Sequence, residues 1–229
     1  EKIIEATYQQ YINLNTVLAD KIIDDLVSKY PDYYQLRLLS ADLKNDLKDP
    51  YARDSRYAEI LEQNPNSFPA LFRRAQLHFP VSNDIVNFPI EDRDLDLAAS
   101  YLMKAASIQP KNPGQQRFLG NVYRGQNKLS MAKQAYESSR LLLGEPDKTD
   151  FTYSNILLML GHVETFSGNY REARKIYDKS LEFLDFKQKP IYFLYPVFTY
   201  FYERDYEQAI IAFTRMRSDI NASDQDQEW

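Results

Sequence analysis

The chain repeats a pattern of packing residues with a period near 34. Pro31 and Pro65 are 34 residues apart, and Pro110 closes a similar stretch; each proline follows a comparable set of small and bulky residues. A small-then-bulky pair, four residues apart, recurs at Ala98/Leu102, Ala132/Tyr136, Ala173/Tyr177 and Ala209/Phe213. A period of this length is typical of stacked helical hairpins, in which each unit buries its apolar face only against its neighbours.

Composition agrees with a folded, helix-rich chain. Of 229 residues, 44% are hydrophobic and 27% are charged, and only 6 are glycine; disordered chains have fewer apolar residues. The net charge of −5 gives no general reason to expect nucleic acid as a partner. Cysteine is absent, which excludes disulfides, thiolate metal sites and cysteine nucleophiles. No apolar run reaches about 18 residues, so we expect no transmembrane segment.

The clearest unit runs from Pro113 to Pro146. Leu119-Gly120, Tyr123, Ala132 and Tyr136 stand at its seventh, eighth, eleventh, twentieth and twenty-fourth places. This pattern resembles the tetratricopeptide repeat, and the run SGNYREARKIYDKSLE in the next unit is close to the consensus of that family. The resemblance implies an all-α fold, a right-handed superhelical α-solenoid built from antiparallel helix pairs.

Six units follow one another in phase, so we predict a single array over residues 1–229. The predicted repeats are 1–33, 34–67, 68–112, 113–146, 154–187 and 190–223, followed by a tail at 224–229. Arg53 stands where the second repeat should have a small residue. The third repeat carries eleven extra residues, which we assign to Phe79–Pro89, with Pro80 and Pro89, within the stretch 79–92. About seven more lie near Glu145–Phe151. The apolar residues Ile85–Phe88 could fold over a groove or could be a tolerated insertion.

In this family the first helix of each repeat lines a concave groove. Carried over place by place, the resemblance assigns partner-binding roles to Arg117, Asn121, Arg124, Asn155, His162, Phe166, Phe198, Phe201 and Tyr202. The same places in these and other repeats hold Tyr8, Tyr11, Ile12, Asp42, Asn45, Asp46, Phe72, Gln76, Phe79, Leu158, Thr165 and Leu194. We therefore expect a groove with acidic, basic and aromatic zones.

Arg117 and Asn121 are the sharpest pair in that set. In chaperone-binding members of the family, a basic residue and an asparagine at these places hold the carboxylate at a peptide's C-terminus, and one helical turn between them suits such a grip. The further polar residues of that clamp are missing here, since Met159, Ile191 and Tyr195 stand at their places. The alternative is a surface arginine and an asparagine that bonds neighbouring backbone.

The last repeat is unusually aromatic from Phe193 to Tyr206. One interpretation is a hydrophobic pocket that anchors a partner's side chains. The other, which we favour, is packing under a terminal segment or against another copy of the chain. Pro196 should kink the helix near its start.

Catalysis finds little support. His78 fits a buried position between helices, and His162 alone makes neither a metal site nor a catalytic pair. Asp92, Asp94 and Asp96 point to different sides of a helix and favour its positive end instead. We expect no catalytic residue, metal or cofactor.

The sequence therefore predicts a non-enzymatic scaffold that binds a protein or peptide. A homo-oligomeric assembly component of an envelope or multiprotein complex is one alternative. A signalling-peptide sensor, or an accessory domain of a larger protein, is another. The chain opens on Glu1 without an initiator Met, so a signal peptide, a lipid-anchor segment or a larger N-terminal part could have been removed. The sequence leaves the compartment open: the cytoplasm, or the bacterial periplasm or a lipid anchor if a signal was removed.

Overall fold

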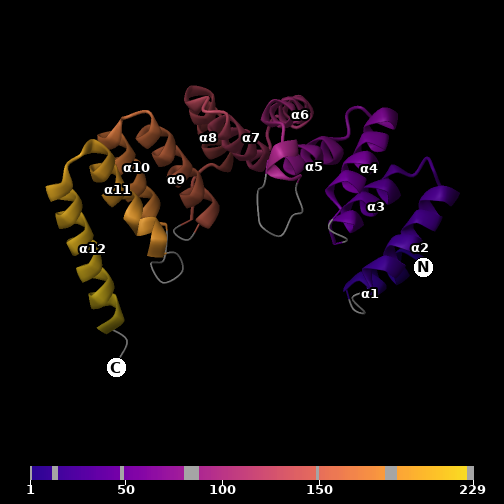
Figure 1. Cartoon of the computed structure of the whole chain (residues 1–229), viewed down its shortest axis with the longest axis horizontal. Coiled ribbons are helices and arrows are strands. Elements are labelled where there is room, and N and C mark those ends of the chain that lie inside the picture. The colour runs from indigo at the N-terminus through magenta and orange to yellow at the C-terminus, as the bar shows by residue number, and fades with distance from the viewer. Residues whose placement is uncertain are drawn as a thin grey trace. The chain divides into compact units, whose positions relative to one another are not determined.

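The computed structural model describes residues 2–11, 15–46, 49–79, 88–147, 150–183 and 190–225, and within these ranges every regular element is a helix (Figure 1). The predicted all-α fold is confirmed. The α-helices are α1 (Lys2–Tyr11), α2 (Thr16–Lys29), α3 (Tyr34–Asp46), α4 (Pro50–Gln63), α5 (Phe68–His78), α6 (Leu95–Ile108), α7 (Pro113–Gly125), α8 (Leu129–Leu143), α9 (Phe151–Phe166), α10 (Tyr170–Leu181), α11 (Tyr195–Glu203) and α12 (Tyr206–Gln225). Two short 3-10 helices are η1 (Ile90–Asp92) and η2 (Pro190–Leu194).

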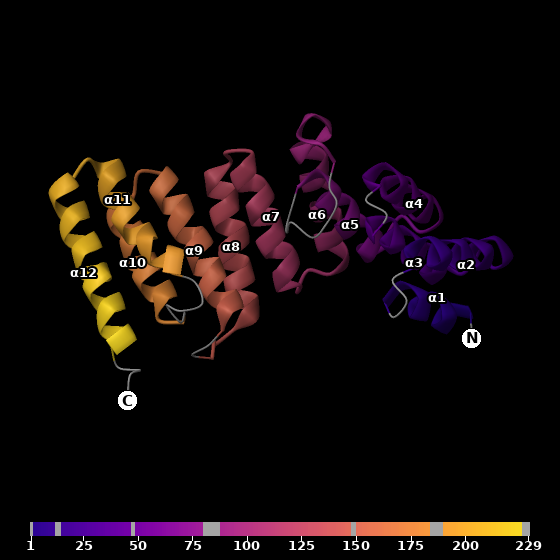
Figure 2. The ribbon, with the colours of Figure 1, turned by 60° about the horizontal axis from the view of Figure 1, so that its bottom comes forward.

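Consecutive helices form antiparallel hairpins (Figures 1 and 2). The packed pairs include α1 with α2, α3 with α4, α5 with α6, α9 with α10 and α11 with α12. Two compact units can be distinguished, residues 1–122 and 123–229. Each unit is a stack of hairpins, and in each the following hairpin packs on the preceding one, as α3 does on α2 and α11 does on α10.

Side chains cap the start of six of the described helices: Asn15, Asp49, Asp94, Asn112, Asp150 and Asp205. In each, a side-chain oxygen accepts a hydrogen bond from the backbone N–H three residues later, at 2.9–3.1 Å. Such a cap satisfies one of the unpaired donors of the first turn and stabilises the helix by about 1 kcal/mol. Asp94 thus supports the start of α6, the role expected for this acidic run.

One turn geometry closes three hairpins. Asn127, Gly168 and Arg204 each stand two residues before a second helix, and each has a left-handed backbone, with φ of 58°, 79° and 63°. The next residue in each turn donates its N–H to the carbonyl five residues back, at 2.8–2.9 Å. This hydrogen-bonding pattern is that of a Schellman motif, which ends a helix and reverses the chain. Asparagine and glycine tolerate this conformation well, so the turns at Asn127-Lys128 and Gly168-Asn169 suit their residues.

The recurring small–bulky pair forms the centre of each hairpin. Both members are at most 2% exposed in five hairpins: Ala19/Ile23, Arg53/Tyr57, Ala98/Leu102, Ala132/Tyr136 and Ala173/Tyr177. In the last hairpin Ala209 is buried, but Phe213 is 45% exposed. Phe213 therefore has the sequence position of a core residue without the neighbour that would cover it.

Arg53 replaces the small residue of its pair and is nevertheless buried. Its guanidinium lies 5.8 Å from the centre of the Tyr57 ring, and its Nη2 donates to the Tyr57 hydroxyl at 3.4 Å. That hydroxyl in turn donates to the carboxylate of Asp42 at 2.6 Å. The cation is accommodated by an aromatic face and a nearby carboxylate rather than by a small side chain.

The end of the predicted insertion returns to the core of the first unit. Phe88 is buried, with its ring centre 4.9 Å from that of His78 and 5.1 Å from that of Tyr51. Its N–H donates to the carbonyl of Leu77 at 3.0 Å. His78 is a buried packing residue, as expected, and burial lowers its pKa. Ile85–Asn87 lie outside the described residues.

The expected kink at Pro196 is wrong. The 3-10 helix η2 ends at Leu194, and α11 begins at Tyr195 with Pro196 in its first turn. Proline is favourable there, because the N–H that it lacks would have had no partner within the helix.

Candidate functional site

Helix α9 supplies the centre of the predicted surface in the second unit. It packs against both α8 and α10, so ten of its residues are buried. Asn155 and His162 are partly exposed, and Phe166 is 62% exposed. These three side chains can therefore contribute to a surface.

Two other residues expected at that surface are in the core. Leu158 is fully buried with Ala173 and Tyr177. Thr165 is also buried, where its hydroxyl donates to the carbonyl of Gly161 at 2.8 Å and lies 3.1 Å from the Tyr177 hydroxyl. The expectation was wrong because α9 has neighbours on two sides, which leaves only a narrow strip of its surface in contact with solvent. Gln76 in the first unit is buried as well.

The polar centre of the surface is a contact between Arg124 and His162. Nη1 of Arg124, at the end of α7, lies 3.0 Å from Nδ1 of His162. Tyr195 of α11 packs edge-on to the imidazole, with ring centres 4.6 Å apart and planes at 90°. Three helices that are distant in sequence thus meet at one polar group.

His162 is neutral at physiological pH. Burial and the adjacent Arg124 charge lower its pKa to about 4. Since Arg124 must donate, Nδ1 of a neutral ring accepts and the proton is on Nε2. The arginine keeps its full positive charge and further N–H donors, which suit a carboxylate or a carbonyl oxygen.

The backbone under His162 is held close to Tyr177. A Cβ atom at Gly161 would lie 2.6 Å from Cδ1 and 2.8 Å from Cζ of Tyr177, and closer still to Cε1. Only glycine allows this approach. The Tyr177 ring also packs 5.8 Å from His162 and 5.6 Å from Tyr195, measured between ring centres. The aromatic core therefore fixes the position of the imidazole.

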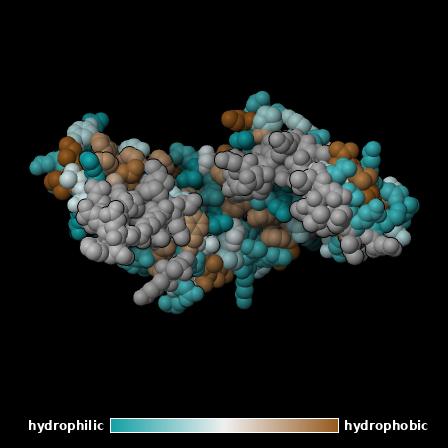
Figure 3. Space-filling model, turned by 90° about the horizontal axis from the view of Figure 1, so that it is seen from below, coloured by the Kyte–Doolittle hydropathy of each residue, from teal (hydrophilic) through white to brown (hydrophobic). Residues whose placement is uncertain are grey.

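Aromatic side chains are exposed on α11. Phe198, Phe201 and Tyr202 have from two-fifths to three-fifths of their surface accessible. Phe198 and Tyr202 occupy the repeat places that His162 and Phe166 occupy in α9. In the view of Figure 3, hydrophobic residues lie in separate clusters among hydrophilic ones. Exposed aromatic rings beside polar groups are typical of protein-binding surfaces.

Arg117 and Asn121 lie on the part of α7 that belongs to the first unit, and both are partly buried. Between them, Phe118 packs edge-on against Phe72, with ring centres 5.4 Å apart. Asn121 makes interactions of its own. Whether this pair grips a carboxylate stays a prediction, and it is separate from the contact between Arg124 and His162.

The sequence did not reveal the part played by Tyr195. It was noted only as a departure from the carboxylate clamp, yet it holds the imidazole in place. Its position in a proline-bounded aromatic run was a signal for packing, but not for this partner.

Within the described ranges, no three His, Asp or Glu side chains are arranged to hold a metal ion. No helix in those ranges is both long and apolar enough to span a bilayer.

Comparison with known proteins identifies the repeat. The family profile of the tetratricopeptide repeat matches residues 154–183, which form the hairpin of α9 and α10. The chain carries a tetratricopeptide repeat and has the tetratricopeptide-repeat fold. No curated protein matches it by sequence.

Several solved tetratricopeptide-type structures are similar over most of the chain. One is a tetratricopeptide repeat protein from Parabacteroides merdae, with a TM-score of 0.69, 16% identity, and coverage of 94% of this chain and 78% of that one. PilF from Pseudomonas aeruginosa has a TM-score of 0.65 and 17% identity, with coverage of 95% of this chain and 89% of that one. MamA from Desulfovibrio magneticus has a TM-score of 0.63 and 16% identity, with coverage of 80% of this chain and 95% of that one. At this identity the likeness shows the fold alone.

Proposed function

We propose that this chain is a non-enzymatic scaffold that binds a protein or peptide through the first-helix surface of its second unit. The tetratricopeptide-repeat fold suggests a role in protein interaction. The observation that carries the proposal is the Arg124 guanidinium held against neutral His162. A charged donor in a fixed position, beside exposed aromatic rings, matches the usual composition of an interface hot spot.

Arg124 would donate to a carboxylate or backbone carbonyl of the partner. Phe166, Phe198 and Tyr202 would contact its apolar side chains. All four residues lie in the second unit. His162 would orient the guanidinium, and its neutrality avoids repulsion between two cations.

A displayed peptide library selected on the whole chain tests this proposal. Enriched peptides should bind the Arg124→Ala variant at least about tenfold more weakly, which corresponds to about 1.4 kcal/mol. Lys104→Ala is the control, because Lys104 is an exposed cation of the first unit. Circular dichroism verifies folding. Failure to enrich any peptide, or equal binding by the Arg124 variant, would refute the assignment.

A second candidate function is self-association, favoured by the exposure of Phe213. Its equivalent Tyr177 is 2% exposed because Tyr195 of the next hairpin packs on it. On α12, Tyr206, Ile210 and Phe213 are spaced so that they share one exposed apolar face. A second copy of the chain offers the same face, and two such faces could pair about a twofold axis.

Light scattering at micromolar concentration distinguishes this alternative. The wild-type chain should have the mass of a dimer, and Ile210→Glu should have the mass of a monomer with an unchanged helical spectrum. Gln208→Glu is a control on the same helix, because Gln208 is exposed and lies on the side opposite Tyr206 and Ile210. A monomeric wild type would exclude self-association through this face.

A further inference from the structure

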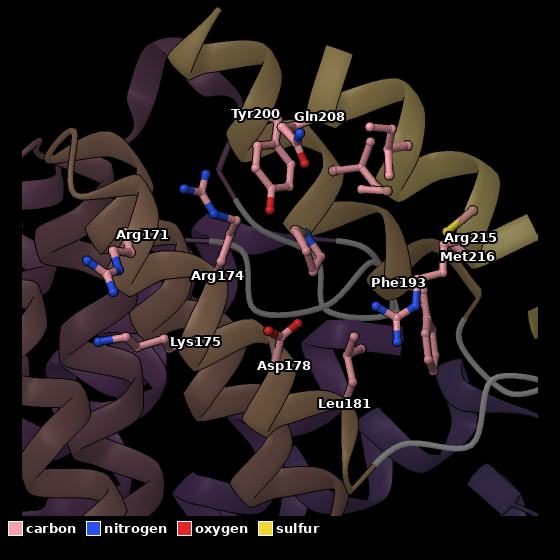
Figure 4. Close-up of a pocket in the computed structure, with 14 residues that line it drawn as sticks. Arg171, Arg174, Lys175, Asp178, Leu181, Phe193, Tyr200, Gln208, Arg215 and Met216 are labelled. Atoms are coloured by element: carbon pink, nitrogen blue, oxygen red, sulfur yellow. The ribbon is translucent and has the colours of Figure 1, made fainter. Parts of the chain in front are cut away.

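A different surface of the second unit is hollowed. It is an open cavity of about 770 Å³ between α10 and α12, with η2 and α11 as its floor (Figure 4). These walls are second helices of their repeats, whereas the surface around Arg124 and His162 is built on first helices. The cavity lies entirely within the second unit.

The walls carry positive charge on both sides. Arg171, Arg174 and Lys175 line the α10 wall, and Arg215 lines the α12 wall (Figure 4). Asp178 is the single carboxylate among the lining residues. The cavity therefore has an excess of cations in a chain whose net charge is −5.

These cations are not equivalent. Nη1 of Arg174 donates to Glu203 at 2.7 Å and to Thr199 at 3.2 Å, and its guanidinium lies 4.2 Å from the centre of the Tyr200 ring. Arg174 is thus a fixed part of the wall, with its charge balanced. Lys175 forms an exposed ion pair with Glu172 at 3.0 Å.

Arg171 and Arg215 are the cations left for a ligand. Neither is within ion-pair distance of an acidic side chain among the described residues, and both are exposed. Arg215 senses the Asp178 carboxylate only as a longer-range charge. An arginine on each wall can hold anionic groups on both sides of a bound segment.

The floor between the walls is apolar. Phe193 and Pro196 are partly exposed there, and Leu181, Ile211 and Met216 add apolar surface from the walls. A nucleic acid duplex would gain from the arginines, but its bases are stacked inside the duplex and have no contact with such a floor. A peptide that alternates apolar and acidic side chains matches both features.

We propose that this groove binds an acidic peptide segment of a partner protein. Apolar side chains of the segment lie on Phe193 and Pro196, and its carboxylates pair with Arg171 and Arg215. The tetratricopeptide array would then have two binding faces in one unit, the second independent of Arg124.

A fluorescein-labelled synthetic peptide in which glutamates flank leucine and phenylalanine tests the proposal by fluorescence anisotropy. The whole chain should bind it saturably, and the Arg171→Glu/Arg215→Glu variant should bind at least about tenfold more weakly, because two attractive contacts become repulsive. Lys104→Glu/Lys111→Glu carries the same change in net charge at exposed sites of the first unit, and should bind as the wild type does. Circular dichroism confirms that both double variants are folded.

Four results would overturn the proposal. The first is the absence of saturable binding. The second is equal binding of a matched peptide with glutamine in place of glutamate, which would leave the arginines without a role. The third is loss of binding in Arg124→Ala instead, which would place the peptide on the first-helix surface. The fourth is displacement of the peptide by a single-stranded oligonucleotide, which would indicate a general anion site.

Discussion

The close approach of Gly161 to Tyr177 makes a sharp prediction about stability. In Gly161→Ala, the new methyl group would overlap three atoms of the Tyr177 ring. The ring has little room to retreat, because its hydroxyl lies 3.1 Å from that of Thr165 and its face packs against Tyr195. Overpacking of this kind costs about 1 to 3 kcal/mol.

Part of that cost is offset, since alanine favours a helix interior over glycine by about 1 kcal/mol. The ring is fixed on several sides, so we take the upper half of the overpacking range and expect a net loss of about 1 to 2 kcal/mol. For a chain of this length, the melting temperature should fall by about 2 to 8 °C.

Thermal melting followed by circular dichroism measures this effect. Gly114→Ala is the matched control, because the nearest atom to its new Cβ would be Oδ1 of Asn112 at an ordinary 3.4 Å. Its melting temperature should stay the same or rise. In a Tyr177→Leu background, Gly161→Ala should cost less, since the two sites are in contact. A Gly161→Ala protein that melts at or above the wild-type temperature would contradict this account of the packing.

Three further predictions concern single side chains. The folded-state pKa of His162, about 4, is below its ordinary value of 6.5. The unfolded chain therefore takes up the proton first, and the free energy of unfolding in urea should fall by about 2 kcal/mol between about pH 7 and pH 5. The His162→Gln variant should lose less unfolding free energy than the wild type over the same pH range. An equal loss would exclude His162 as the cause. Lys133→Met should lower the free energy of unfolding in urea by about 1 to 3 kcal/mol, because Lys133 pairs with buried Glu164 at 2.5 Å. Adding Glu164→Gln to that variant should recover part of the loss. A Lys133→Met protein as stable as wild type would disprove the role of the pair. Arg204→Gly should stabilise by about 1 kcal/mol, since it removes a left-handed non-glycine residue, and a lower melting temperature would argue against strain there.

The repeat pattern predicted the fold because its positions encode contacts within a hairpin. Ala173 and Tyr177 are adjacent on one helix face, and Gly168 closes the turn, so their roles follow from local sequence. Arg53 shows the limit of such rules. It breaks the small-residue rule, but Asp42 and Tyr57 compensate through contacts that the spacing alone does not reveal.

The candidate site was only partly predictable. Arg124 and His162 were each assigned to the surface, but their contact joins residues 38 positions apart and depends on how α7 meets α9. Leu158 was expected at the surface but is buried, because the repeat pattern does not say how tightly neighbouring helices cover α9. The groove with Arg171 and Arg215 was not anticipated, since the resemblance directed attention to first helices.

The three turns of one geometry have a consequence for how the chain reaches its fold. Each reverses the backbone with hydrogen bonds between residues at most five apart, so closing a hairpin requires little loss of chain entropy. Contacts of short sequence separation form quickly. In a repeat array, folding can begin in one hairpin and spread to its neighbours. The hairpin of α9 and α10, with its turn at Gly168 and its interlocked Gly161 and Tyr177, is the natural starting point in the second unit. Substitutions there should slow refolding more than substitutions of equal cost in α12.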